Sequence, residues 1–139
     1  MVLRMLWLQR HSAWAPVPLR LALGFLFLSH GYVKLFGDFG AVVNFFTSVG
    51  VPAPSFFVLV VGLVELVGGI LLVLGGLVRL SSLLLVIDML LALFLVGFSK
   101  SYLGGWEFEL LLLGGCLTLL LSGAGRWSLD KDDQGPVGM

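Results

Sequence analysis

The sequence predicts an all-α, polytopic membrane protein whose four transmembrane helices form a single bundle. Of its 139 residues, 59% are hydrophobic and only 12% are charged, and the mean hydropathy is +1.10. The apolar residues gather in four runs, each close to the ~20 residues that an α-helix needs to cross the hydrocarbon core of a bilayer. The runs are continuously apolar, whereas the strands of a membrane β-barrel alternate apolar and polar residues. The chain length leaves no room for a second domain.

Residues 1–16 precede the first run and are expected to lie along the membrane interface. An early basic residue, Arg4, and the tripeptide AWA weakly imitate a signal peptide with its cleavage site. The apolar stretch before Arg10 is, however, too short for the core of a signal peptide. Trp7 and Trp14 stand among basic residues, which is typical of a segment anchored at the lipid headgroups.

The predicted membrane domain covers residues 17–130, and residues 131–139 form a polar C-terminal tail. Sequences rich in Gly, Pro and Ser, such as GVPAPS, interrupt the apolar runs. A tight turn near Val78 and Arg79 is all that separates the second run from the third, so these two helices must be antiparallel neighbours. The spans are predicted at about residues 17–36, 56–76, 80–98 and 105–122.

The connection between the first two spans is longer than a turn requires. Its apolar residues recur at helical spacing, and Asp38 stands where it would cap the start of a helix. We therefore expect a short amphipathic helix on the outer surface, with an irregular loop as the alternative. The apolar positions are Phe39, Val42, Val43, Phe46 and Val49.

The basic residues predict the orientation of the chain in the membrane. Basic residues near the ends of spans are retained on the cytoplasmic side. Six of them fall on the side of the two termini, and only Lys34 and Lys100 fall on the other, so both termini are expected in the cytoplasm. The acidic residues of the tail, Asp130, Asp132 and Asp133, carry little weight in this rule. The six are Arg4, Arg10, Arg20, Arg79, Arg126 and Lys131.

Four ionisable side chains are predicted to meet in the outer half of the bundle. They are His30 and Lys34 in the first span, Glu65 in the second and Glu107 at the outer mouth of the fourth. A charge at the bilayer centre costs about 3 kcal/mol or more, so such groups face protein or a wet cavity. Lys34 paired with Glu65 or Glu107, and hydrogen-bonded by His30, would satisfy these charges. The alternative is an ion pair that only fixes helix packing.

Helical periodicity assigns an inward face to three of the spans. Since Glu109 lies about 200° around the helix from Glu107, only one of the two can point squarely inward. The expected faces are Arg20, Gly24, Phe27, Gly31 and Lys34 in the first span, Gly62, Glu65, Gly69, Leu72 and Gly76 in the second, and Glu107, Leu111, Gly114 and Thr118 in the fourth.

The sequence also predicts the surroundings of four further residues. Arg20, near the cytoplasmic end, is expected to reach along the helix to water. Asp88 falls on a mostly apolar face and is expected to be a protonated acid bonded within the bundle, with no partner identifiable. Cys116 is the single cysteine and is expected to serve packing. Glu109 is a weaker candidate for the cluster than Glu107.

Several function classes lack their sequence signatures. There is no phosphate-binding loop, no dinucleotide fingerprint, no zinc-type spacing and no activated serine. The only histidines, His11 and His30, are predicted on opposite sides of the membrane, which disfavours a haem pair and any metal site. The residues therefore predict neither a required cofactor nor a nucleic-acid partner.

Four stretches together resemble the DoxX family of small bacterial membrane proteins. They are RLALGFLFLSHGYVKLF, GLVELVGGILLVLGGLVRLSSLLLVIDMLLAL, GGWEFELLLLGG and SGAGRWSLD, which occur in the family's order between about Leu19 and Asp130. Asp88 and Glu109 make this chain more polar than the usual family pattern. The positions that match the family motif are Arg20, Gly24, His30, Gly31, Lys34, Glu65, Gly68, Gly75, Arg79, Met89, Ala92, Glu107, Gly125, Ser128 and Asp130.

The resemblance implies a four-helix bundle in the bacterial plasma membrane and a role as the membrane subunit of a redox complex. Its relatives include subunits of a thiosulfate:quinone oxidoreductase, so quinone or thiosulfate would be handled at the polar cluster, with a soluble redox or sulfur-metabolism protein, lipid or a second copy as partner. Histidine and carboxylates at membrane depth are compatible with proton delivery to a quinone. The alternatives are a non-catalytic anchor or assembly partner, and a small-solute or proton transporter.

The charge distribution yields a prediction about topology. A reporter protein fused after Asp130 is expected to behave as cytoplasmic, because six of the eight basic residues lie on the side of the termini. Paired fusions of an enzyme active only in the cytoplasm and one active only outside it measure this. If the external reporter is active when it is fused after Asp130, the predicted orientation is wrong.

Overall fold

The computed structural model describes residues 6–131, and helices account for nearly all of its regular structure. The predictions for Arg4 and for the acidic residues Asp132 and Asp133 therefore lie outside the described residues. The α-helices are α1 (Leu6–Arg10), α2 (Pro16–Phe36), α3 (Phe39–Ser48), α4 (Pro54–Leu74), α5 (Val78–Leu95) and α6 (Glu107–Ser122), with short helical turns at Ser12–Trp14, Gly97–Ser99 and Tyr102–Trp106.

Four helical segments within the described residues are long and apolar enough to cross a membrane, which confirms the predicted fold class. They cover Ser12–Phe36, Pro54–Leu74, Val78–Leu95 and Tyr102–Ser122. Pro16 and Pro54 begin α2 and α4, where a missing backbone N–H costs nothing. The tight turn after α4 lies at residues 75–77, slightly before the predicted position, because Gly75 and Leu77 take the left-handed conformation.

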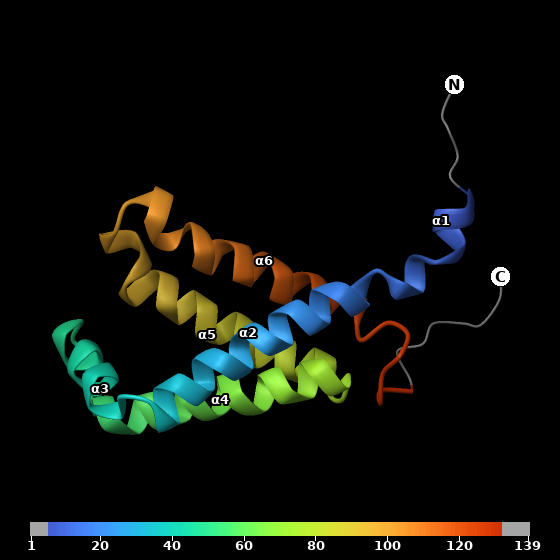
Figure 1. The fold of residues 1–139 in the computed structure, drawn as a ribbon. Helices are drawn as coiled ribbons and strands as arrows, with labels where there is room; N and C mark the ends of the chain where they lie inside the picture. The colour runs from blue at the N-terminus through green and yellow to red at the C-terminus, as the bar shows by residue number, and fades with distance from the viewer. Residues whose placement is uncertain (1–5, 132–139) are drawn as a thin grey trace.

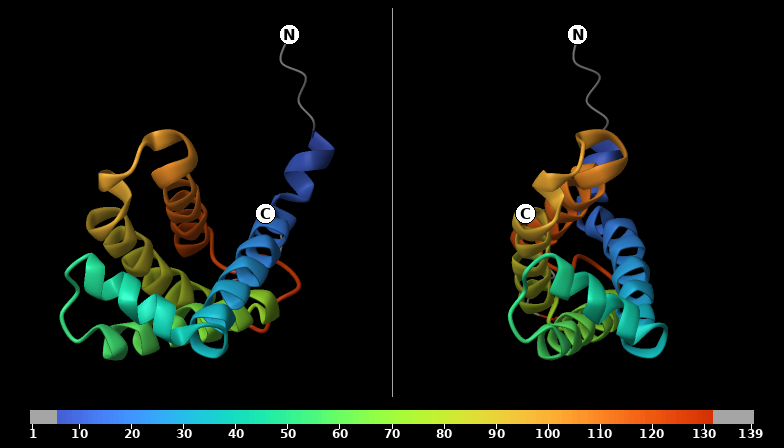
Figure 2. Two further views of the ribbon diagram at one scale, coloured as in Figure 1. Left: turned by 60° about the vertical axis from the view of Figure 1, so that its left-hand side comes forward. Right: turned by 90° about the vertical axis from the view of Figure 1, so that its left-hand side faces the viewer.

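Helix α3 is the short helix predicted between the first two spans, and the irregular loop is excluded. Asp38 caps it, since the Oδ1 atom accepts a hydrogen bond of 2.9 Å from the backbone N–H of Ala41. The helix crosses the end of the bundle where α2 ends and α4 begins, far from α1 (Figures 1 and 2). Its side chains thereby cover one end of the bundle.

Helices α2 and α4 make the closest helix contact in the bundle. A Cβ atom on Gly24 would lie 2.9 Å from the carbonyl oxygen of Gly69, and a Cβ atom on Gly31 would lie 2.7 Å from that of Gly62. Atoms do not approach so closely, so these positions require glycine. This small-residue contact confirms the inward faces that periodicity assigned to the first two spans.

The apolar core lies toward the end of the bundle where the chain begins and ends. Cys116 is fully buried in it, as expected for a packing residue, between Leu112 and Leu119 of α6. Residues of α2, α4 and α5 complete this core, chiefly Leu23, Phe27, Leu72, Val78, Leu85, Val86 and Met89.

Arg20 does not reach water, and the prediction that it does is wrong. Its side chain is only 1% exposed. Nη1 donates a hydrogen bond of 2.9 Å to the carbonyl oxygen of Ala124, and Nη2 donates one of 2.6 Å to that of Trp127. The segment after α6 folds back over α2, so carbonyl oxygens that are distant in sequence replace water around the guanidinium group.

The same C-terminal segment also caps the third span. The carboxylate of Asp130 accepts hydrogen bonds of 2.7 and 2.8 Å from the backbone N–H groups of Leu77 and Val78, which begin α5. In return, the backbone N–H groups of Leu129 and Asp130 donate to the carbonyl oxygen of Gly75. Residues 124–130, which we call the C-terminal clamp, thus join α2, α4 and α5.

We predict that Arg20→Ala destabilises the protein by about 2–4 kcal/mol, because it removes two charge-assisted hydrogen bonds, to the carbonyl oxygens of Ala124 and Trp127, together with the packing of a buried side chain. Thermal unfolding in mild detergent measures the change. The exposed Arg126 offers the control, since Arg126→Ala is expected to change the free energy of unfolding by less than about 0.5 kcal/mol. If the two substitutions lowered the stability equally, the contacts of Arg20 with the C-terminal clamp would not stabilise the protein.

Candidate functional site

A cavity of about 420 Å³ opens between the helices at the end covered by α3. We call it the polar cavity, because six of its lining residues carry ionisable groups in otherwise apolar walls. These are His30 and Lys34 from α2, Glu65 from α4, Asp88 from α5, Glu109 from α6, and Lys100 from the connection between α5 and α6. Apolar lining residues include Phe27, Phe45, Phe46, Phe57, Val61, Met89, Leu91 and Phe108.

Lys34 and Glu65 form an ion pair at the inner wall of the polar cavity, which is one of the two pairings that the sequence predicts for Lys34. The Nζ atom of Lys34 donates to the Oε2 atom of Glu65 at 2.5 Å, and the side chains are 21% and 4% exposed. The close helix contact at Gly31 and Gly62 lets the lysine reach across from α2 to α4. In this low dielectric the pair neutralises a carboxylate that could not stay charged alone.

Asp88 adds a second carboxylate beside this pair. It is 8% exposed, and its charge interacts with those of Glu65 and Lys34. One lysine therefore faces two acidic groups. The Oδ2 atom of Asp88 and the Oε2 atom of Glu109 are buried and have no hydrogen-bond partner among the described residues. Buried polar atoms are nearly always paired, so these two oxygens mark a place for water or a ligand.

His30 lines the cavity without joining the ion pair. Among the described residues, its ring makes no hydrogen bond with the Lys34 ammonium group, although the sequence analysis predicts one. The ring is exposed and lies 6.4 Å, between centroids, from the ring of Phe108. It therefore stands at the exposed edge of the cavity.

The predicted inward face of the fourth span is wrong, and Glu107 is not part of the cavity. The Oε1 atom of Glu107 accepts a hydrogen bond of 2.7 Å from the backbone N–H of Gly104, at the start of its own helix. Leu111 is 71% exposed, and a Cβ atom on Gly114 would meet nothing within 4 Å. Thr118, the fourth residue of that face, is also exposed.

Glu109 takes the place predicted for Glu107. The buried face of α6 consists of Leu112, Cys116 and Leu119, and Glu109 stands one turn before Leu112. Their spacing of three or four residues is a signal that sequence analysis could have used. The non-helical backbone of Leu103, Gly104 and Gly105 sets the start of α6 and hence the rotation of its face.

Lys100 is a lining residue that the sequence analysis used only for orientation. Its ammonium group lies 6.0 Å from the ring centroid of Phe45 in α3, near the mouth of the cavity. No local pattern points to it, because only the tertiary fold brings the α5–α6 connection next to α3. Arg20, by contrast, lies at the other end of the bundle and does not line the cavity.

Comparison with known proteins supplies the family. The sequence model of the DoxX family matches residues 15–97, which is more than half of the chain. The chain belongs to the DoxX family. The matched region of this DoxX protein contains α2 to α5, and with them His30, Lys34, Glu65 and Asp88, whereas Glu109 lies beyond it.

Two curated relatives cover most of this DoxX protein. "Uncharacterized membrane protein Rv3486" of Mycobacterium tuberculosis is 36% identical over 126 residues, which is 81% of this chain and 77% of the relative. "Putative oxidoreductase CatD" of Bacillus subtilis is 34% identical over 112 residues, which is 81% of each chain. No solved structure matches the chain. Within residues 6–131, no three His, Cys, Asp or Glu side chains are grouped to hold a metal ion.

We predict that Lys34→Met destabilises this DoxX protein by about 3 kcal/mol, because it leaves two buried carboxylates, those of Glu65 and Asp88, without a cation. The double variant Lys34→Met/Glu65→Leu is expected to recover part of that loss. A double-mutant cycle on thermal unfolding in detergent measures the coupling between the two residues. If the two single effects simply add, the pair does not hold the bundle together.

Proposed function

We propose that this DoxX protein is the membrane subunit of a redox complex and binds the headgroup of a quinone in the polar cavity. The observation that carries the proposal is the pair of buried, unpartnered carboxylate oxygens, on Asp88 and Glu109, in an otherwise apolar cavity at membrane depth. A redox enzyme of the membrane needs such groups to exchange protons with a ligand that water does not reach.

The size and walls of the polar cavity fit a quinone ring. Small-molecule sites commonly span ~300–1,000 Å³ and combine apolar walls with a few convergent polar groups. At about 420 Å³ the cavity lies in this range. Phe27, Phe46 and Phe108 offer surfaces against which a ring can pack, and Lys34 and His30 offer donors for carbonyl oxygens.

The charge of the cavity favours a neutral ligand over thiosulfate. Three carboxylates line it, those of Glu65, Asp88 and Glu109, against two ammonium groups. One of these, Lys34, is already bonded to Glu65. A doubly charged anion would lose its hydration in a cavity whose buried cation, Lys34, is already bonded to Glu65, whereas a neutral quinone would not pay this cost.

A bound quinone takes up two electrons and two protons, with one proton on each carbonyl oxygen. Asp88 and Glu109 are the groups that can pass these protons on, through the two oxygens that the protein leaves unbonded. His30 at the exposed edge replaces them from water. Lys34 is already bonded to Glu65, so in this proposal the pair sets the field of the cavity rather than carrying protons. The two electrons come from a redox centre on a soluble partner protein.

The relatives and the arrangement of basic residues support the remaining parts of the proposal. One relative is named an oxidoreductase, and both relatives are bacterial, in agreement with the bacterial plasma membrane. Lys34 and Lys100 line the cavity at one end, whereas Arg79 bonds the last carbonyl groups of α6 at the other. With both termini in the cytoplasm, the polar cavity opens on the outer side.

A non-catalytic anchor or assembly partner is the second candidate, and the paired Lys34 and Glu65 favour it, since an ion pair alone can fix helix packing. Such a role accounts for the pair. It does not account for the unbonded oxygen atoms of Asp88 and Glu109, because packing alone needs no buried carboxylate oxygen without a hydrogen bond.

We predict that a quinone without a side chain raises the melting temperature of the wild type in detergent, since a ligand at 100 times its Kd stabilises the folded state by about 2.7 kcal/mol. Glu109→Leu is expected to abolish this shift, because it removes an oxygen that faces the ligand. The matched control is Glu107→Leu on the same turn of α6, which is expected to keep the shift.

Sodium thiosulfate, tested in the same way, is expected to give no shift beyond that of sodium sulfate. If no quinone stabilises the wild type, the redox-site proposal fails and the anchor role stands. If Glu109→Leu leaves the increase in melting temperature unchanged, the quinone binds outside the polar cavity.

A further inference from the structure

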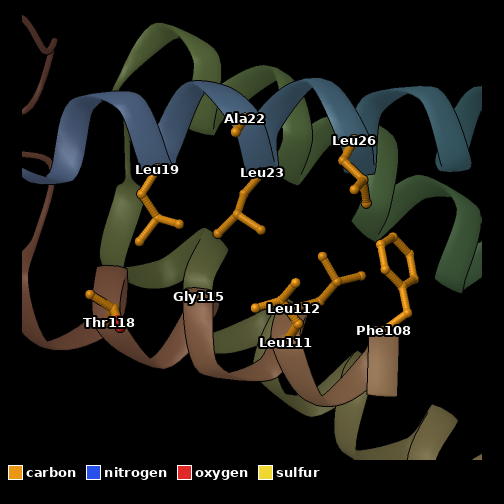
Figure 3. Close-up of a pocket in the computed structure, with 9 residues that line it drawn as sticks. All are labelled: Leu19, Ala22, Leu23, Leu26, Phe108, Leu111, Leu112, Gly115 and Thr118. Carbon is orange, nitrogen blue, oxygen red and sulfur yellow. The ribbon is translucent and has the colours of Figure 1, made fainter. Parts of the chain in front are cut away.

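A second cavity of about 350 Å³ lies in the seam between α2 and α6 (Figure 3). We call it the lateral crevice. Its nine lining residues are Leu19, Ala22, Leu23, Leu26, Phe108, Leu111, Leu112, Gly115 and Thr118. Of the four seams between neighbouring spans, the one between α2 and α6 is the most loosely packed. The crevice therefore occupies the weakest side of the bundle.

The lateral crevice adjoins the polar cavity. Leu26, Phe108 and Leu112 line both of them. Figure 3 shows Leu26 and Phe108 at one end of the crevice, with Phe108 reaching from α6 toward α2 and Leu112 nearer the middle. Because the ring of Phe108 also lies beside that of His30, the crevice joins the polar cavity at the edge where His30 stands.

The crevice is apolar and open toward the region that lipid occupies. Its single hydroxyl group, on Thr118, already donates a hydrogen bond of 2.9 Å to the carbonyl oxygen of Gly114 in its own helix. Ala22 and Leu111 are exposed on its two sides. Its walls thus offer a passing ligand dispersion contacts and no polar partner.

Small residues keep the crevice open. Ala22 presents only a methyl group on α2 (Figure 3). Gly115 presents no side chain on α6, where a Cβ atom would lie 2.9 Å from a methyl group of Leu23. A larger side chain at either position would fill the space between the helices.

We propose that the lateral crevice binds the hydrocarbon chain of the ligand whose headgroup occupies the polar cavity. The inference rests on the proposed function and makes its substrate a membrane-resident quinone that enters from the lipid. A chain fits because the crevice is apolar and adjoins the headgroup site along Leu26, Phe108 and Leu112. A transmembrane helix of a partner does not fit, because a helix of ~10 Å diameter covers the seam from outside without reaching Leu26 and Leu112.

The test compares two quinones with the same headgroup, one without a side chain and one with a ten-carbon chain. Their Kd values are measured on the full chain in lipid nanodiscs, for the wild type, for Ala22→Phe, which blocks the crevice, and for Gly114→Leu. Gly114 is the matched control, because it neighbours Gly115 on α6 but faces open space.

The wild type and Gly114→Leu are expected to bind both quinones. Ala22→Phe is expected to bind the chainless quinone as the wild type does and to bind the long-chain quinone at least about tenfold more weakly, a loss of about 1.4 kcal/mol. Gly115→Leu blocks the crevice from α6 and is used where Ala22→Phe lowers the melting temperature of the unliganded protein.

Equal binding of the long-chain quinone to the wild type and to both blocked variants would overturn the crevice as the chain site, while the headgroup proposal would stand. Loss of both quinones from the blocked variants would overturn it as well, since the two cavities would then not be separable sites. Failure of the chainless quinone to bind the wild type would instead overturn the proposed function, and this inference with it.

Discussion

The close contact of α2 with α4 at two pairs of glycines determines where the charged groups of this protein can lie. A Cβ atom on Gly31 would lie 2.7 Å from the carbonyl oxygen of Gly62, and one on Gly62 would lie 2.6 Å from the side chain of Leu35, so both positions need glycine for this approach. Only at this separation can Lys34 reach Glu65, and a buried ion pair is tolerable only when its geometry is good. A wider separation would leave both charges in an apolar medium without compensation.

That contact also explains why one side of the bundle is loose. Since α2 packs most tightly against α4, and α6 packs chiefly against α5, the seam between α2 and α6 is the one left with the fewest contacts. The polar cavity and the lateral crevice both border this seam, and they share Leu26, Phe108 and Leu112. Tight packing on one side of α2 and open space on the other thus follow from the same distribution of small residues.

The sequence predicted the features that depend on a single helix or on one helix face. The four spans, α3 with its cap at Asp38 and the pairing of Lys34 with Glu65 follow from run length and helical periodicity. Features that depend on how distant segments meet were not predictable. Arg20 was expected in water because its acceptors, the carbonyl oxygens of Ala124 and Trp127, lie more than 100 residues away.

The fourth span shows a related limit. Choosing Glu107 over Glu109 as the inward residue required the rotation of α6, which the kinked backbone around Gly104 sets. The proximity of Asp88 to Glu65, and that of Lys100 to Phe45, likewise depend on the tertiary fold. Periodicity restricted the alternatives to one of two glutamates, and only packing decided between them.

The C-terminal clamp has a consequence for the order in which the protein matures. Arg20 lies near the start of the first span and is synthesised before its carbonyl acceptors, which lie more than 100 residues later in the chain. Until that segment docks, the bundle holds a guanidinium group without its final partners and a third span without the Asp130 cap. Docking of residues 124–130 is therefore a late step in assembly, and a chain cut before them would leave Arg20 without the acceptors that compensate its charge.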